Sequence, residues 1–107
     1  GLYILDCSTE QIRRCTPSEG IAINNVSYLT PASNDGIWIV AHIGQIVHYN
    51  KKDEKYTLLS DQIKGELKPS SWCAFDDEDG HLYIGHAQGG LSIIDLENKT
   101  RARAAQS

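Results

Sequence analysis

The amino-acid sequence predicts an all-β fold, a fragment of a β-propeller with about two four-stranded antiparallel blades and the outer strands of a preceding blade. Three segments that begin at residues 1, 45 and 90 support this prediction, because they are copies of one another at an almost fixed spacing: GLYILD, QIVHYN and GLSIID. Strand-like segments that recur at this period are typical of propeller blades, each of which stacks on its neighbours to bury its apolar faces.

The length limits how much of a propeller the chain can contain. Its 107 residues hold little more than two repeats, whereas closed propellers use roughly 4 to 8 blades. The chain begins at Gly1 with a copy of a third strand, so we expect two strands of that unit upstream. We interpret residues 1–107 as one propeller fragment, with the remaining blades of a parent propeller as its partners. Its expected parts are outer strands at 1–15, a blade at 26–59 and a blade at 72–104.

The repeats divide into four expected strands per blade, numbered from the propeller centre outward. The second strand of each blade is the most apolar, which is typical of a sheet covered on both faces. Trp38 and Tyr83 occupy equivalent positions there, and we expect them to pack between blades rather than to stack on carbohydrate. The expected strands are 26–29, 37–41, 45–50 and 56–59 in one blade and 72–75, 82–85, 90–95 and 101–104 in the other.

Glycines and aspartates mark the expected turns. Asp35 and Gly36 precede one second strand as Asp79 and Gly80 precede the other. Asp-Gly pairs supply the positive φ that tight hairpin turns require. Gly89 and Gly90 stand between a second and a third strand, and without a following lysine or helix we interpret them as turn residues rather than a phosphate-binding loop.

The order of these motifs resembles a known family. Residues 72–95, WCAFDDEDGHLYIGHAQGGLSIID, are similar to the two-component regulator propeller repeat: an apolar strand, Asp-x-x-Gly, a Leu-Trp-Ile-Gly-Thr-like strand, Gly-Gly-Leu and a further strand. Residues 26–50 are a more divergent copy, in which Ile37–Ile39 match the second strand. Val40 and Ala41 replace the usual Gly and Thr, and Gln45 replaces the second Gly.

The resemblance implies a function. Proteins with such repeats carry them in the periplasmic sensor region of hybrid two-component sensor histidine kinases, many of which sense oligosaccharides. We therefore expect a non-catalytic, periplasmic fragment that contributes to ligand sensing for signal transduction, and the resemblance implies an oligosaccharide as the ligand. The alternative is a pair of blades from a freestanding secreted propeller that acts as a lectin-like or protein-binding scaffold, or as the frame of an enzyme, because propellers host many activities.

Composition and motifs argue against several other functions. The net charge is −4 and basic residues are scattered, so we expect no nucleic-acid binding. The longest apolar run, residues 37–41, is far too short to span a bilayer, so we expect no membrane contact. The acidic run 76–79 would place Phe75 and His86 at the first and last positions of a calcium loop, where carboxylates are needed, so we expect a solvated acidic turn there instead. We expect no metal, no cofactor and no catalytic residues.

One face of the expected propeller carries candidate ligand-binding residues. His42 and His86 stand at the ends of the second strands, and with Gln88, Asn24 and Asn25 they form a loose polar set suited to a hydroxyl-rich ligand. The alternative, which we weight more heavily, is that these are ordinary exposed loop residues.

The cysteines and the apolar faces give two further expectations. Cys7, Cys15 and Cys73 are expected to be free thiols buried as small apolar groups, because Cys7 and Cys15 fall about 10 Å apart in the expected hairpin. Two blades without their neighbours expose apolar sheet faces, so we expect the isolated chain to self-associate.

Overall fold

The computed structural model describes residues 2–15, 21, 25–33, 35–41, 45–61, 71–86 and 89–104. Ten β-strands and one 3-10 turn, η1 (Leu59–Asp61), form all the regular structure in this part of the chain, and it contains no α-helix. None of the described segments provides a helix that could cross a membrane. The prediction of an all-β fold is confirmed.

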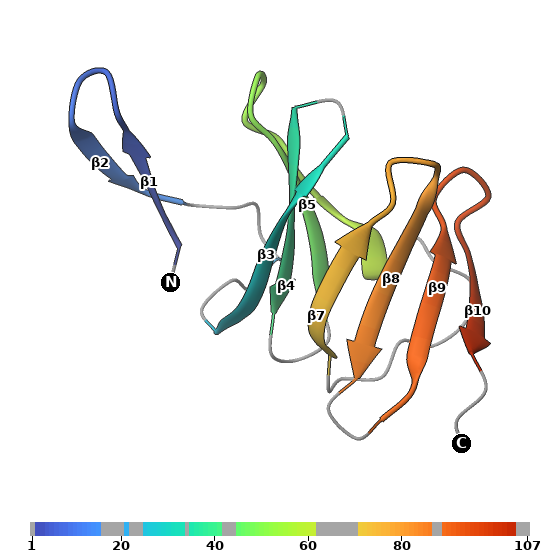
Figure 1. Ribbon diagram of the computed structural model, residues 1–107. Helices are drawn as coiled ribbons and strands as arrows, with labels where there is room; N and C mark the ends of the chain where they lie inside the picture. Colours follow the sequence, from blue (N-terminus) through green and yellow to red (C-terminus); the bar gives the residue numbers. More distant parts are fainter. Residues whose placement is uncertain are drawn as a thin grey trace.

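The strands form one hairpin and two four-stranded antiparallel sheets, which we call sheet I and sheet II (Figure 1). In both sheets each strand pairs with the next one along the chain, as in a propeller blade. The hairpin contains β1 (Tyr3–Asp6) and β2 (Gln11–Arg14); sheet I contains β3 (Val26–Ala32), β4 (Gly36–Ala41), β5 (Ile46–Asn50) and β6 (Tyr56–Leu58); sheet II contains β7 (Ser71–Asp76), β8 (His81–His86), β9 (Leu91–Asp95) and β10 (Thr100–Ala104).

The same irregularity occurs in the first strand of both sheets. The pairing of β3 with β4 shifts register between Val26 and Tyr28, and that of β7 with β8 shifts between Ser71 and Cys73. A bulge adds one residue to one strand and increases the local twist. Because the bulge recurs at the same place, the repeat extends to the backbone geometry. Sheets I and II therefore have the arrangement expected of two successive blades.

Sheets I and II pack against each other through alternate residues of their strands. In Figure 1 the two sheets lie next to each other, with β3 beside β7. Successive side chains on a strand point to opposite faces, so one face of sheet I forms this interface. The buried residues of this core are Trp38, Val40, Ile46 and Leu59 from sheet I and its 3-10 turn, and Ala74, Leu82, Ile84 and Ile94 from sheet II.

The other face of sheet I is buried in part by residues at the base of the β1–β2 hairpin. Ile39, Val47 and Tyr49 form a second buried cluster with Cys15, against which Leu2 and Ile4 also pack. Both faces of β4 are therefore covered, which explains the almost continuous apolar run in its sequence.

Sheet II is covered on one face only within the described residues. Tyr83 pairs with Ile93 as Trp38 pairs with His48, so Tyr83 and Trp38 hold equivalent positions. Trp38 is only 5% exposed because sheet II covers it, whereas Tyr83 is half-buried and its neighbour Phe75 is 62% exposed. Equivalent positions thus differ in burial because the face of Tyr83 has no described sheet against it.

The turns use positive φ at partly different residues from those expected. Asp35 has φ of 62° and Gly80 has φ of 89°, but in the second turn the other positive φ is at Glu78, at 59°, and not at Asp79. Gly36 is required for a steric reason and not for positive φ, because a Cβ atom there would lie 2.2 Å from Nε2 of His48. Gly89 and Gly90 have φ of 90° and 92°.

The expectation for the cysteines is correct in part. Cys7, Cys15 and Cys73 are all free thiols, but only Cys15 is buried. Cys7 lies in the turn after β1, where no apolar element can cover it, and Cys73 is on the exposed face of sheet II. Burial of Cys7 and Cys73 was therefore wrongly predicted.

Candidate functional site

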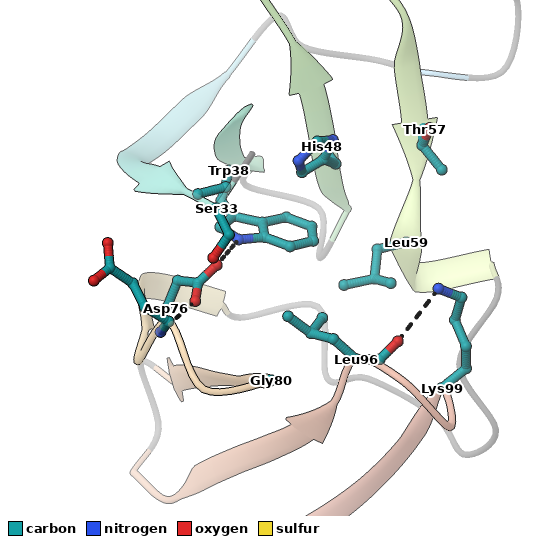
Figure 2. Close-up of a pocket in the computed structure, with 11 residues that line it drawn as sticks. Ser33, Trp38, His48, Thr57, Leu59, Asp76, Gly80, Leu96 and Lys99 are labelled. Atoms are coloured by element: carbon teal, nitrogen blue, oxygen red, sulfur yellow. Dashed lines mark hydrogen bonds between the residues drawn. The ribbon is translucent and has the colours of Figure 1, made fainter. Parts of the chain in front are cut away.

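A cavity of about 610 Å³ lies between sheets I and II, where β3 and β7 end and β4 begins (Figure 2). Cavities of roughly 300–1,000 Å³ are typical of small-molecule sites. Both sheets and the turns after β7 and β9 contribute to its wall. The lining residues are Ala32, Ser33, Trp38, His48, Thr57 and Leu59 from the first blade and Asp76, Glu78, Gly80, Leu96 and Lys99 from the second.

A hydrogen bond between the two sheets forms one wall of the cavity. The indole Nε1 of Trp38 donates to Oδ2 of Asp76 at 2.8 Å, and the backbone N–H of Glu78 donates to Oδ1 at 2.8 Å. Asp76 is only 8% exposed, although the acidic run 76–79 was expected to be a solvated turn. The difference arises because Asp76 is the last residue of β7 and faces sheet I, while the turn itself begins after it.

His48 lies against Trp38 inside the same wall. The two rings meet edge to face, with centroids 4.8 Å apart and an interplanar angle of 72°. Burial lowers the pKa of His48, and the nearby carboxylates of Asp76 and Asp53 oppose this effect without reversing it. The imidazole is therefore neutral at pH 7.

The charged groups of the cavity are separated. Asp76 ends β7, and Glu78 lies two residues further along, in the turn that follows. Lys99 comes from the turn after β9, and its Nζ donates to the backbone oxygen of Leu96 at 3.4 Å. Figure 2 shows Asp76 and Lys99 on opposite sides, with Leu59 and Leu96 between them. The cavity thus has an acidic end, a basic end and an apolar centre.

The residues predicted for a ligand-binding face lie elsewhere or outside the described residues. His86 ends β8 and is only 8% exposed, with Nε2 2.7 Å from Oγ of Ser92. Asn25 is exposed immediately before β3. His42, Asn24 and Gln88 lie outside the described residues.

The cavity and the expected ligand-binding face are at opposite ends of the strands. The cavity is next to the start of β4, near Trp38, whereas the expected face is at the ends of β4 and β8. The alternative, that His86 is an ordinary exposed loop residue, is also wrong. Its side chain is buried, with Nε2 beside Oγ of Ser92. Sequence reasoning missed the cavity because its wall combines a strand end, two turns and a 3-10 turn from different repeats.

The acidic turn after β7 provides no metal site in the part of the chain that the structure describes, where no group of three or more metal-binding side chains is found. Asp77 accepts hydrogen bonds from the backbone N–H groups of Asp79 and His81 at 2.8 and 3.1 Å. Partial burial acts to raise the pKa of Asp77, but these hydrogen bonds and the His81 imidazole outweigh it and lower the pKa. Its carboxylate therefore stabilises the turn.

Comparison with known proteins shows a similarity to the extracellular domain of another protein. No protein-family model and no curated protein matches the chain. A crystal structure of the extracellular domain assigned to a hybrid two-component system of B. thetaiotaomicron matches with a TM-score of 0.65 and 25% sequence identity. The match covers 98% of this chain but only 14% of that domain's chain. The chain is therefore similar to a short segment of a much larger extracellular domain.

Proposed function

We propose that this chain is a non-catalytic segment of the extracellular sensor domain of a hybrid two-component system. The observation that carries the proposal is the structural match to such a domain over 98% of the chain, at 25% identity and a TM-score of 0.65. The match includes both sheets and the hairpin, so it rests on the arrangement of repeats and not on a single strand pair.

The sequence motifs support the same function independently. Residues 72–95 resemble the two-component regulator propeller repeat in the order and spacing of their motifs, and the pairing of β7, β8 and β9 places these motifs on successive strands of one sheet. By that resemblance the segment would act in the periplasm, with the kinase in another part of the protein. Its ligand would be an oligosaccharide, as in many members of that family.

The first experiment is to determine the reading frame on both sides of this segment. A membrane helix and a histidine kinase domain downstream are the expected result. A stop codon soon after Ser107, with a secretion signal upstream, would overturn the proposal in favour of a freestanding secreted propeller.

Ligand sensing is tested on the complete extracellular region of the protein. Calorimetric titration with a panel of oligosaccharides is expected to give saturable binding for one class of glycan. Kinase activity in the complete membrane protein should then change with that glycan and not with an unrelated one. Absence of glycan binding by a folded extracellular region would exclude the oligosaccharide and leave the sensor assignment to the reading-frame test.

A further inference from the structure

We propose that the cavity between sheets I and II binds a small zwitterion whose two charges lie at opposite ends of an apolar chain, of the kind represented by an aliphatic ω-amino acid. The charges and apolar side chains of the wall match such a ligand, with acidic groups at one end, an ammonium at the other and a hydrophobic floor between them. This site goes beyond the sensor function proposed above, which does not require it.

The acidic end of the cavity calls for a cation. Asp76 is 8% exposed, and its two hydrogen-bond donors, the Trp38 indole and the Glu78 backbone, are both neutral. Among the described residues no cationic side chain is within ion-pair distance of Asp76. Buried carboxylates are rarely left without a cationic partner, and Glu78 adds a second carboxylate to this end. A ligand ammonium would supply the missing charge.

The opposite end calls for an anion. Lys99 is half-buried, and its hydrogen bond to the Leu96 oxygen holds the ammonium at the cavity wall. Within the described residues no carboxylate pairs with Lys99. His48 supplies no competing positive charge at neutral pH, because burial lowers its pKa. A ligand carboxylate would pair with Lys99 by a charge-assisted hydrogen bond.

The region between the charged ends is apolar. Leu59 is 3% exposed, Leu96 is half-buried, and the Trp38 ring lies beside them (Figure 2). The aliphatic part of a ligand placed there would gain binding free energy from leaving water. A neutral sugar, in contrast, would leave the charges at both ends of the wall unpaired, at a cost in affinity.

The test uses three probes that differ only at their charged ends and needs no mutation. 6-Aminohexanoate carries both charges, 6-aminohexanamide lacks the carboxylate, and 6-acetamidohexanoate lacks the ammonium. Each is titrated into the full chain, with tryptophan fluorescence reporting on Trp38 and calorimetry as the second readout. We expect saturable binding of 6-aminohexanoate, and binding of the other two that is weaker by roughly tenfold or more, since each loses one charged hydrogen bond.

Two variants then assign the ends of the ligand. Lys99→Gln should abolish the preference for 6-aminohexanoate over 6-aminohexanamide, and Glu78→Gln should reduce the preference for 6-aminohexanoate over 6-acetamidohexanoate. Lys52→Gln is the matched control, because Lys52 is exposed and pairs with Asp35 away from the cavity. Equal binding of all three probes, or no saturable binding of 6-aminohexanoate by the folded chain, would overturn the proposal. Neither result bears on the sensor function, which depends on the reading frame.

Discussion

The indole Nε1 of Trp38 donates a 2.8 Å hydrogen bond to Oδ2 of Asp76 across the interface between sheets I and II. Both residues are almost fully buried, with 5% and 8% exposure. A hydrogen bond to a carboxylate is strong where water is excluded, and a buried carboxylate that loses its donor is costly. This bond therefore links the two sheets, while the negative charge of Asp76 has no cationic partner among the described residues.

Removal of the indole should destabilise the chain through two separable effects. Trp38→Phe keeps an aromatic ring but removes the donor, and we expect a loss of about 1.5–3 kcal/mol in the free energy of unfolding. Trp38→Ala also leaves a cavity in the core, for an expected loss of roughly 3–5 kcal/mol. Chemical denaturation measures both. A loss below about 1 kcal/mol for Trp38→Ala would show that the ring is exposed.

A double-mutant cycle isolates the bond itself. Trp38→Phe and Asp76→Asn are measured alone and together, and we expect a coupling energy of about 0.5–3 kcal/mol. Asp79→Asn is the matched control, since Asp79 is an exposed carboxylate of the same turn and should show no coupling to Trp38. A coupling energy near zero for Asp76 would mean that the bond contributes nothing beyond packing.

Gly36 should tolerate no side chain while His48 is present. A Cβ atom there would lie 2.2 Å from Nε2 of His48, and the imidazole cannot withdraw freely because it packs edge-on against Trp38. We expect Gly36→Ala to cost about 1–3 kcal/mol of folding free energy by overpacking. In a His48→Ala background the same substitution should cost much less. An equal cost in both backgrounds, by denaturant titration, would locate the conflict in the backbone instead.

The strand order could be predicted from the sequence because local signals agreed with one another. The copies at 1–6, 45–50 and 90–95 predicted three corresponding strands, and the structure places β1, β5 and β9 there. The apolar run 37–41 predicted a strand covered on both faces, as β4 is. The positive φ of Glu78 could not be predicted, because the turn residue that adopts it depends on register and not on composition.

The cavity could not be predicted, because its wall depends on contacts between repeats. Asp76 belongs to an acidic run that is typical of a solvent-exposed turn, and only the packing of β7 against sheet I buries it. Trp38 was correctly expected between the sheets, but its Nε1 partner lies 38 residues away, and no periodic pattern indicates such a pair. His42 and His86 were predicted to bind a ligand because they stand at the ends of strands. That position gives no information on the burial of their side chains.

Protonation of His48 should weaken the fold. Burial lowers the pKa of this imidazole below its ordinary value, with opposing contributions from Asp76 and Asp53. The unfolded chain therefore binds the proton more readily, so the stabilising effect of neutral His48 is complete above the unfolded pKa of about 6.5 and is lost as the pH falls below it. His48→Gln should show a smaller loss of stability than the natural chain between about pH 7 and 5, measured by denaturation at each pH. Identical pH profiles would contradict this assignment.

The two ends of the array expose apolar surface that an adjoining sheet could cover. On sheet II the exposed face carries Phe75 at 62% exposure. On the hairpin, Leu5 and Ile12 are cross-strand partners with 55% and 68% exposure. Because these two faces differ, contact between copies would be head to tail, and such contacts give either rings or open chains.

We therefore predict that the isolated chain self-associates and that charge on either face prevents it. Phe75→Lys and Ile12→Lys should each shift the chain toward the monomer, because a buried unpaired ammonium at the contact is unfavourable. Thr57→Lys is the control, as an exposed position on neither face. Light scattering at micromolar concentrations measures the mass. If the natural chain is monomeric at these concentrations, the two exposed apolar faces do not drive association, and the prediction is wrong. If it associates but neither lysine variant changes the mass, the contact uses another surface.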